Sequence, residues 1–94
     1  MKTWRVISVV WDEGFKRSYR KRIQRRPYLR KRFWDRLEVF LENPSASQLR
    51  THRLSGKLSG QCAFSIDDDY RVIFEFVSEG TVMLVDFGTH EEVY

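Results

Sequence analysis

Three apolar segments in the second half of the sequence constrain the fold more than any other feature. They are CAFSI at 62–66, YRVIFEFV at 70–77 and TVMLVDF at 81–87. Each is rich in the β-branched and aromatic residues typical of strands, and the segments between them are short enough for hairpin turns. Because tight turns join strands that run in opposite directions, the three segments predict an antiparallel meander.

The first half of the sequence predicts one strand and two helices. WRVISVV at 4–10 is apolar on both faces, which indicates a buried strand. A helix should follow, with Asp12 as its N-cap and Pro27 at its end, because apolar residues recur every four positions at Phe15, Tyr19 and Ile23. Asn43 and Pro44 should end a second helix, whose apolar stripe is Leu29, Phe33, Leu37, Phe40 and Leu41.

The element order β-α-α-β-β-β predicts one α+β domain over residues 1–94, with a helical pair packed on the antiparallel meander sheet in two layers. The first strand should pair with a meander strand, since an isolated strand would leave its backbone groups unpaired. Segment 43–61 is expected to be a long loop, with at most a turn of helix, and such loops tend to be functional. The aromatic residues expected in the core include Trp4, Trp11, Trp34, Phe74 and Phe76.

Composition excludes several classes of protein. No apolar run approaches the roughly 20 residues of a membrane span, and the first residues lack the layout of a signal peptide. Cys62 is the only cysteine, so the chain can form neither an internal disulfide nor a zinc site of several cysteines. His52 and His90, even with an acid such as Asp86, would make only a weak metal site. We therefore expect a cytoplasmic protein without a metal or other cofactor.

The charge is distributed unevenly along the chain. Residues 16–36 contain eleven Lys or Arg and one acid, whereas residues 61–94 contain one Arg and eight acids. Such asymmetry favours a polyanionic partner, nucleic acid or ribosome, that meets the first half. The alternative is a solvated helix surface that only keeps the protein soluble.

The candidate functional residues come from three separate segments. His52, Arg53 and Lys57 lie in the long loop, Arg71 lies near the start of a meander strand, and the tail GTHEEVY carries His90 and Tyr94. Arg71 should pair near Phe87, so loop, Arg71 and tail are expected to converge on one edge of the sheet. Histidine titrates near neutral pH, arginine holds phosphate, and an aromatic ring stacks on an unpaired base.

Such a group suits cleavage of RNA by its own 2′-hydroxyl. That reaction needs a base, positive charge at the phosphate and an acid for the leaving oxygen. Structural alternatives remain open: His52 bonding a loop carbonyl, His90 capping the end of the sheet, Tyr94 packing on Phe87 or Val93, and Arg71 pairing with Asp69, Asp86 or Glu75.

The stretch HRLSGKLSGQCAFSIDDDYRVIF, followed by VMLVDFGTHEEVY, resembles the RelE/ParE superfamily of toxins from bacterial type II toxin–antitoxin systems. The resemblance covers nearly the whole chain and is strongest to the RelE and YafQ branch. It implies a RelE-like fold and a metal-independent endoribonuclease, an mRNA interferase that enters the ribosomal A site. It also implies a cognate RelB/DinJ-like antitoxin, a toxin–antitoxin complex that binds operator DNA, and no membrane partner.

The resemblance also implies roles for individual residues. Arg71 matches the arginine at the scissile phosphate, His90 the tail histidine that acts as general acid or base, and Tyr94 the terminal tyrosine. His52 matches the loop histidine of the family, and Asp69 matches its aspartate at the start of the strand. Tyr70 stands where the family has a tryptophan. Candidate RNA contacts, beside Tyr70, are Arg53, Lys57, Lys16, Arg20 and Arg30.

The sequence departs from the family pattern at four positions. Ser65 and Asp86 stand where YafQ-like enzymes carry a histidine and an arginine, and Phe64 and Ile66 stand where RelE-like enzymes carry lysines. Besides a nuclease, the sequence therefore allows a ParE-like inhibitor of DNA gyrase, or a member of the fold that binds RNA or the ribosome without cleaving.

Overall fold

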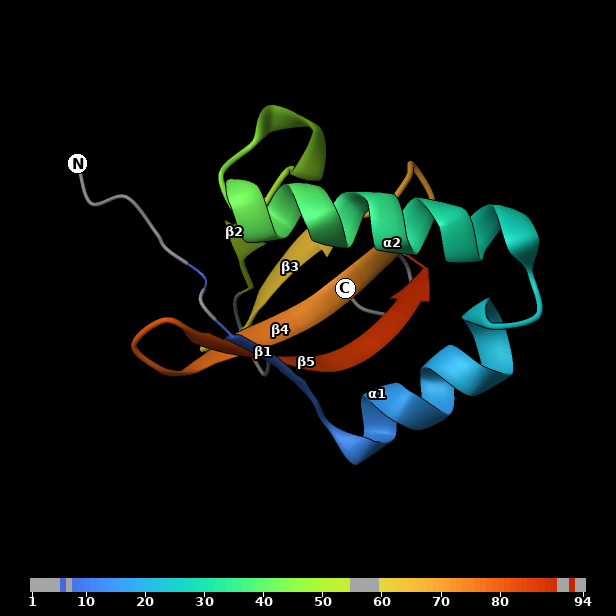
Figure 1. Ribbon diagram of the computed structural model, residues 1–94, viewed down its shortest axis with the longest axis horizontal. Coiled ribbons are helices and arrows are strands. Elements are labelled where there is room, and N and C mark those ends of the chain that lie inside the picture. Colours follow the sequence, from blue (N-terminus) through green and yellow to red (C-terminus); the bar gives the residue numbers. More distant parts are fainter. Residues whose placement is uncertain (1–5, 7, 55–59, 90–91, 93–94) are drawn as a thin grey trace.

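The computed structural model describes residue 6 and residues 8–54, 60–89 and 92 (Figure 1). Strand β1 (Ser8–Trp11) leads into helix α1 (Glu13–Ser18), a π-helical segment η1 (Tyr19–Ile23) and helix α2 (Pro27–Glu42). A 3₁₀ turn η2 (Ser47–Leu49) follows, and then strands β2 (His52–Arg53), β3 (Cys62–Ser65), β4 (Tyr70–Ser78) and β5 (Thr81–Thr89). None of the described helices is long and apolar enough to cross a membrane.

The five strands form one mixed sheet in the order β1-β5-β4-β3-β2. Strands β3, β4 and β5 pair antiparallel, which confirms the predicted meander and its turns. Strand β1 pairs parallel with β5, so the expectation that it joins the meander is also confirmed. The two helices lie in the connection between β1 and the rest of the sheet, as the predicted order requires.

The interpretation of the first strand as buried on both faces is wrong. Strand β1 covers Ser8–Trp11 and lies at the edge of the sheet, where β5 is its single neighbour among the described strands. Val10 is 43% exposed as a result. Of the predicted segment 4–10, residues 4, 5 and 7 lie outside the described residues. Apolar composition indicated a strand correctly, but it carried no information on how many neighbours the strand would have.

The first helix begins as predicted but does not stay α-helical. The Asp12 carboxylate accepts a hydrogen bond from the Gly14 amide at 2.9 Å, which caps α1. In η1 the Gln24 amide donates to the Tyr19 carbonyl at 2.9 Å, an i→i+5 bond. Apolar residues spaced by four drift about 40° per step around an α-helix of 3.6 residues per turn. The wider π turn compensates for this rotation, so Phe15, Tyr19 and Ile23 all face the core.

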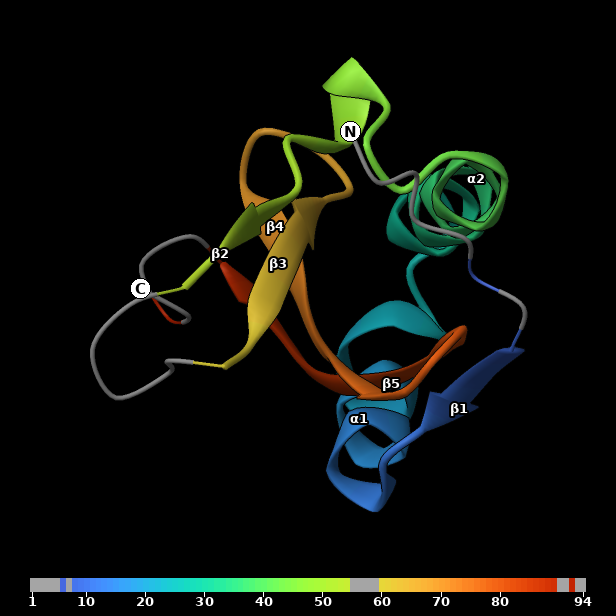
Figure 2. The same ribbon diagram turned by 90° about the vertical axis from the view of Figure 1, so that its left-hand side faces the viewer.

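The main core lies between the helices and one face of the sheet (Figure 2). Aromatic rings dominate it. Phe40 of α2 stacks on Phe64 of β3 with 4.7 Å between the ring centroids, and it meets Phe74 of β4 edge-on with a centroid distance of 4.9 Å. Phe15 and Phe33 are fully buried in the same cluster. Each buried aromatic side chain removes a large apolar area from water, so this layer dominates the stability of the domain.

Three side chains expected in the core lie at the surface instead. Leu41, Trp34 and Phe76 are 42%, 47% and 43% exposed. The apolar stripe of α2 is therefore narrower than predicted. Trp34 covers the edge of the core, where its indole nitrogen donates to the Tyr19 hydroxyl at 2.9 Å. Trp11 and Phe74 pack in or against the core as expected, and Trp4 lies outside the described residues.

The predicted long loop at 43–61 contains the η2 turn and a strand that the sequence did not indicate. Strand β2 has only two residues, His52 and Arg53, which pair with Ala63 and Cys62. Gly- and Ser-rich sequence does not favour strands, so only the exposed edge of β3 explains this pairing. Residues 55–59 lie outside the described residues.

The Phe40→Ala variant tests the role of the aromatic layer. We expect it to lower the free energy of unfolding by about 3–5 kcal/mol, because it leaves a cavity against two buried rings. Urea unfolding followed by circular dichroism measures the change. The matched control is Leu41→Ala on the exposed side of the same helix, with an expected change within about 0.5 kcal/mol. Equal losses from both variants would contradict this account of the core.

Candidate functional site

The face of the sheet that the helices leave uncovered carries the first two candidate residues. The register aligns His52 with Ala63, Ala63 with Ile73, and Ile73 with Asp86, in one row across four strands. Residues directly opposite each other in antiparallel strands share a face. Ala63 and Ile73 belong to a small apolar cluster with Leu54, separate from the main core. His52 and Asp86 are exposed and lie in the same row, on what we call the open face.

The neighbouring row of the open face contains Arg71. Ser65 pairs with Arg71, and Arg71 pairs with Gly88, the position next to the one expected from the sequence. Side chains two residues apart on a strand point to the same face, so Arg71 and His52 face the same side of the sheet. The chain leaves the sheet after Thr89, directly beside the Arg71 row. The structure thus brings the loop residue His52, Arg71 and the start of the tail to one face.

Arg71 is buried, with 8% of its surface exposed, and its guanidinium binds backbone carbonyls. Its Nη1 donates to the carbonyl oxygens of Asp67 at 2.8 Å, Tyr70 at 3.1 Å and Asp68 at 3.3 Å. Among the described residues it forms no salt bridge, so the alternative of a carboxylate partner is wrong. These bonds hold the turn between β3 and β4 and fix the position of the guanidinium.

His52 is positioned by the residue at the end of the 3₁₀ turn. Its Nδ1 lies 2.9 Å from the carbonyl oxygen of Arg50, the loop-carbonyl bond that the sequence left open. Arg50 adopts a left-handed conformation with φ of 51°, which turns the chain into β2. In the tautomer that carries its proton on Nδ1, the imidazole donates this hydrogen bond to the carbonyl. Arg53, the next residue, alternates to the opposite side of the strand.

The β3–β4 turn determines where Asp69 and Tyr70 lie. Asp69 is exposed, and its amide donates to the Asp67 carboxylate at 2.9 Å. The ring of Tyr70 stacks on Phe87 at 5.2 Å and packs against the main core. Tyr70 is a candidate RNA contact, and its ring lies on the helix side of the sheet. Because Arg71 follows Tyr70 in the strand, the two side chains face opposite ways.

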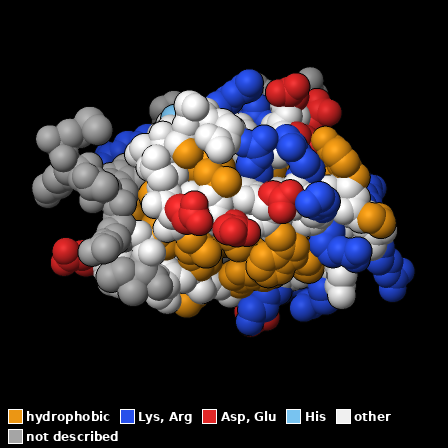
Figure 3. Space-filling model, turned by 45° about the horizontal axis from the view of Figure 1, so that its top comes forward, with side chains coloured by type: hydrophobic (Ala, Val, Ile, Leu, Met, Phe, Trp, Pro, Cys, Tyr) orange, Lys and Arg blue, Asp and Glu red, His pale blue; other side chains and the backbone are white. Residues whose placement is uncertain are grey.

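The basic candidates of the first half lie on the helices, away from the open face. Lys16 pairs with Glu13 at 3.2 Å, and Arg30 donates to the Gln24 carbonyl at 2.8 Å. Arg20 is exposed on η1. In Figure 3 the Lys and Arg side chains gather mainly on the right-hand half of the molecule, where Figure 1 places α1 and the start of α2. His90, Tyr94 and Lys57 lie outside the described residues.

An ion pair that the sequence analysis missed holds the start of the tail. Nη2 of Arg22, in η1, contacts both carboxylate oxygens of Glu92 at 2.7 and 3.0 Å. Nη1 of the same arginine donates to the Phe87 carbonyl at 3.3 Å. Glu92 also closes a capping box: its carboxylate accepts from the Thr89 amide at 2.8 Å, and its own amide donates to the Thr89 hydroxyl at 3.2 Å. The Thr-x-x-Glu spacing at 89–92 was the signal available in the sequence.

These contacts change the acidity of Glu92. The backbone hydrogen bond from Thr89 and then the Arg22 guanidinium lower the pKa of the Glu92 carboxyl from 4.5 to about 2. A carboxyl with a depressed pKa stabilises the folded state fully above its unfolded pKa and loses this effect as the pH falls towards the folded value. The clasp between Arg22 and Glu92 is therefore complete at neutral pH and opens only in strong acid.

Carbon-detected NMR titration of the Glu92 carboxyl tests the clasp. We expect a midpoint near 2 in the original protein. In Arg22→Ala the midpoint should rise, though not fully to 4.5, because the Thr89 hydrogen bond remains. Lys16→Ala, which removes a different helix cation, should leave the Glu92 midpoint unchanged. A Glu92 midpoint near 4.5 in the original protein would show that the clasp does not form.

The described part of the chain offers no site for a metal ion. No three His, Cys, Asp or Glu side chains gather there in a way that could hold one. Cys62 is buried in the main core, and this burial raises the pKa of its thiol, which makes the thiol unreactive. The chemistry available on the open face is that of an imidazole, a guanidinium and the nearby carboxylates.

Comparison with known proteins assigns the chain to a family. The sequence profile described as the bacterial toxin of type II toxin–antitoxin system, YafQ, matches residues 7–94. The chain therefore belongs to the YafQ family of toxins. No curated protein matches it in sequence.

Solved structures of similar toxins share the fold. A YoeB/ParE toxin from Agrobacterium tumefaciens has a TM-score of 0.74 and 15% identity, over 89% of this chain and 99% of that one. A metal-bound toxin from Helicobacter pylori has a TM-score of 0.72 and 20% identity, over 93% and 98% of the two chains. YafQ from E. coli strain BL21(DE3) has a TM-score of 0.70 and 13% identity, over 92% and 96%.

The same E. coli toxin also matches within its DinJ–YafQ complex, with a TM-score of 0.64 and 15% identity over 92% and 96%. At these identities the likeness concerns the fold. Two helices packed on a mixed sheet of five strands are the RelE-like architecture that the sequence predicted.

Proposed function

We propose that this toxin is a ribosome-dependent endoribonuclease that cuts mRNA in the ribosomal A site through attack of the RNA 2′-hydroxyl. One observation carries the proposal within the YafQ family. His52 and Arg71 share the open face of the sheet, next to the point at which the tail leaves β5. An imidazole and a guanidinium supply the proton transfer and the phosphate charge that this reaction needs, without a metal ion.

The roles follow from the chemistry of each group. Nε2 of His52 accepts or donates a proton, with Nδ1 held by the Arg50 carbonyl. Arg71 stabilises the charge on the scissile phosphate. Its hydrogen bonds to the described residues all come from Nη1, so a phosphate would meet the other guanidinium nitrogens. His90 supplies the second proton transfer, Tyr94 stacks on a base, and Asp69 orients the groups at the start of β4.

The same proposal covers partners and location. A cognate antitoxin, comparable to DinJ in the E. coli complex, would block the toxin, and the pair would bind operator DNA. The basic residues of the helices, with Lys16, Arg20 and Arg30 among them, would dock on ribosomal RNA with a strongly salt-dependent affinity. Action on ribosomes places the protein in the cytoplasm.

Primer extension on mRNA with purified ribosomes tests the activity. We expect cuts within codons at the A site, and His52→Gln should slow them by about 10²–10⁴-fold, the usual contribution of general acid–base catalysis. The control is Glu79→Gln, an exposed residue of the β4–β5 turn outside both the candidate site and the basic helices, which should cut at nearly the original rate. Undiminished cleavage by His52→Gln would remove His52 from the mechanism.

Asp86 favours a second candidate function, a toxin that binds the ribosome without cutting. Its carboxylate is exposed on the open face in the same row as His52 and would repel a phosphate there. Absence of cuts by the original protein, with ribosome binding intact, would support this candidate. Absence of both would direct attention to DNA gyrase.

Asp86→Asn tests how this carboxylate acts on cleavage. The amide oxygen can still accept the hydrogen bond from the Phe87 amide, which measures 2.8 Å, so the local backbone should be preserved. Removing a surface charge near a phosphate is worth about 1 kcal/mol, and we expect cleavage to rise by about three- to tenfold. Slower cleavage by the variant would show that the carboxylate takes part in the reaction.

A further inference from the structure

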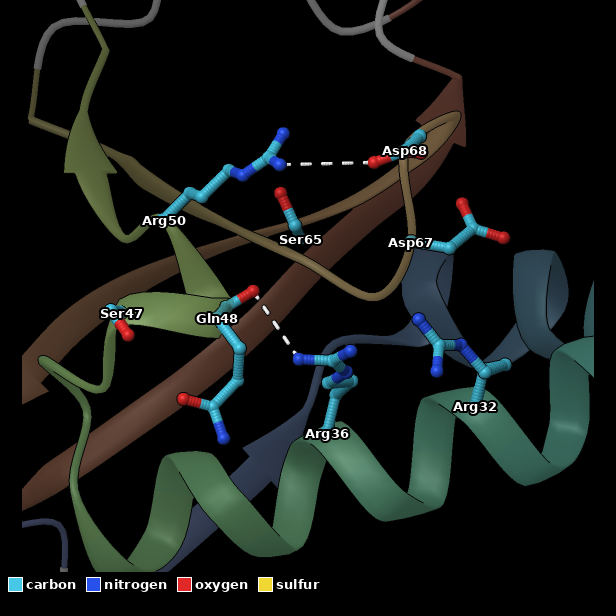
Figure 4. A pocket seen from close by; sticks show the side chains of 8 residues that line it. All are labelled: Arg32, Arg36, Ser47, Gln48, Arg50, Ser65, Asp67 and Asp68. Atoms are coloured by element: carbon cyan, nitrogen blue, oxygen red, sulfur yellow. Dashed lines mark hydrogen bonds and ion pairs between the residues drawn. The ribbon is translucent and has the colours of Figure 1, made fainter.

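A cavity of about 230 Å³ lies at the outer edge of β3, between α2, the η2 turn and the β3–β4 turn (Figure 4). This volume is below the roughly 300 Å³ at which pockets for drug-sized molecules begin. The cavity therefore fits a single group, such as a phosphodiester, better than a whole small molecule.

Three arginines line the cavity from two sides. Arg32 and Arg36 are one helical turn apart on α2, so both rise from the same face of the helix, and Arg50 enters from the opposite side (Figure 4). The Nε of Arg32 is buried and has no hydrogen-bond partner in the described part of the chain. Arg36 reaches only the Gln48 carbonyl, at 3.3 Å. A buried guanidinium N–H without an acceptor points to an anion that the described residues do not supply.

Ser65 adds an uncharged donor to the same wall. It is 4% exposed, and its hydroxyl has no hydrogen-bond partner among the described residues. In Figure 4 this hydroxyl points towards the end of the Arg50 side chain. Strand β2 pairs only with Cys62 and Ala63, so it does not cover β3 at Ser65. The edge of a sheet that carries such donors can accept an oxyanion.

The two aspartates of the lining do not neutralise the arginines. The Asp67 carboxylate accepts from the backbone amides of Asp69 at 2.9 Å and Tyr70 at 2.8 Å, so it serves the turn. Asp68 meets Arg50 at 3.8 Å, and the two side chains are 93% and 65% exposed. Such a long, exposed pair is weak, and a phosphate could displace Asp68 from Arg50.

We propose that this cavity, which lies beside the open face, binds a backbone phosphate of RNA. This proposal rests on the proposed function. The β3–β4 turn connects the two places, because Arg71 bonds the carbonyls of Asp67 and Asp68 while both residues also line the cavity. An RNA strand that crosses the open face at Arg71 continues over this turn into the arginine cluster. A second phosphate held there fixes the register of the strand at the reacting phosphate.

Binding of a short 2′-O-methyl RNA oligonucleotide, followed by fluorescence anisotropy, tests the cavity. Arg36→Gln should weaken binding by about tenfold and lower the slope of log affinity against log salt by about 0.7, as for one lost phosphate contact on a single strand. The matched control is Lys31→Gln on the same helix, which removes the same charge outside the cavity and should weaken binding by about twofold at most.

Ser65→Ala removes a donor without any change in charge. We expect about three- to tenfold weaker binding of the oligonucleotide, whereas stability should be unchanged or higher because the lost hydroxyl was buried and unpaired. A thermal melt of the same variant checks that the fold is intact. Inorganic phosphate should compete with the oligonucleotide in the original protein and less well in Ser65→Ala.

Equal effects of Arg36→Gln and Lys31→Gln, with no effect of Ser65→Ala, would overturn the proposal. It would also be overturned if the cavity variants weakened only the complex with an antitoxin, because the occupant would then be an acidic protein side chain. The oligonucleotide cannot be cut, so its binding is independent of catalysis. If the cavity variants weaken oligonucleotide binding but the original protein cuts no mRNA, the nuclease is refuted and this site stands. If the original protein cuts mRNA but the cavity variants bind the oligonucleotide as well as it does, this site alone is refuted.

Discussion

The aromatic contacts between helix α2 and the sheet determine which face of this protein remains available to ligands. Phe40, Phe64 and Phe74 are fully buried and lie within 4.7–5.9 Å of one another, so one sheet face is filled by the helical layer. The opposite face keeps only a small apolar cluster around Ala63 and Ile73. The placement of the candidate residues on the open face therefore depends on this aromatic layer.

Arg71 connects stability with the proposed chemistry. Its guanidinium is buried and bonded to the carbonyls of the β3–β4 turn, which is a structural role. A side chain already held in place loses little conformational entropy when it binds a phosphate, so the same contacts would preorganise it for catalysis. The clasp of Arg22 on Glu92 likewise ties the described part of the tail to η1.

Much of the fold could be predicted because its signals are local. Period-two patterns with short turns located β3, β4 and β5, and caps and apolar spacing located the helices. Errors arose where the outcome depended on distant segments. Strand β1 is exposed because it lies at the sheet edge, and β2 exists only because β3 offers a partner. The capping box of Thr89 and Glu92 was readable in the sequence and was missed.

The sequence by itself determined the kinds of elements, their order, the basic first half and the presence of an imidazole and a guanidinium suited to RNA. These properties follow from neighbouring residues, whose periodicity and turn chemistry act over a few positions. Only the tertiary structure decided that His52 and Arg71 share a face and that Arg22 reaches Glu92. It also decided that two arginines of α2 and Arg50 line one cavity with Ser65. Such contacts join residues far apart in the chain, and packing of the two layers brings them together.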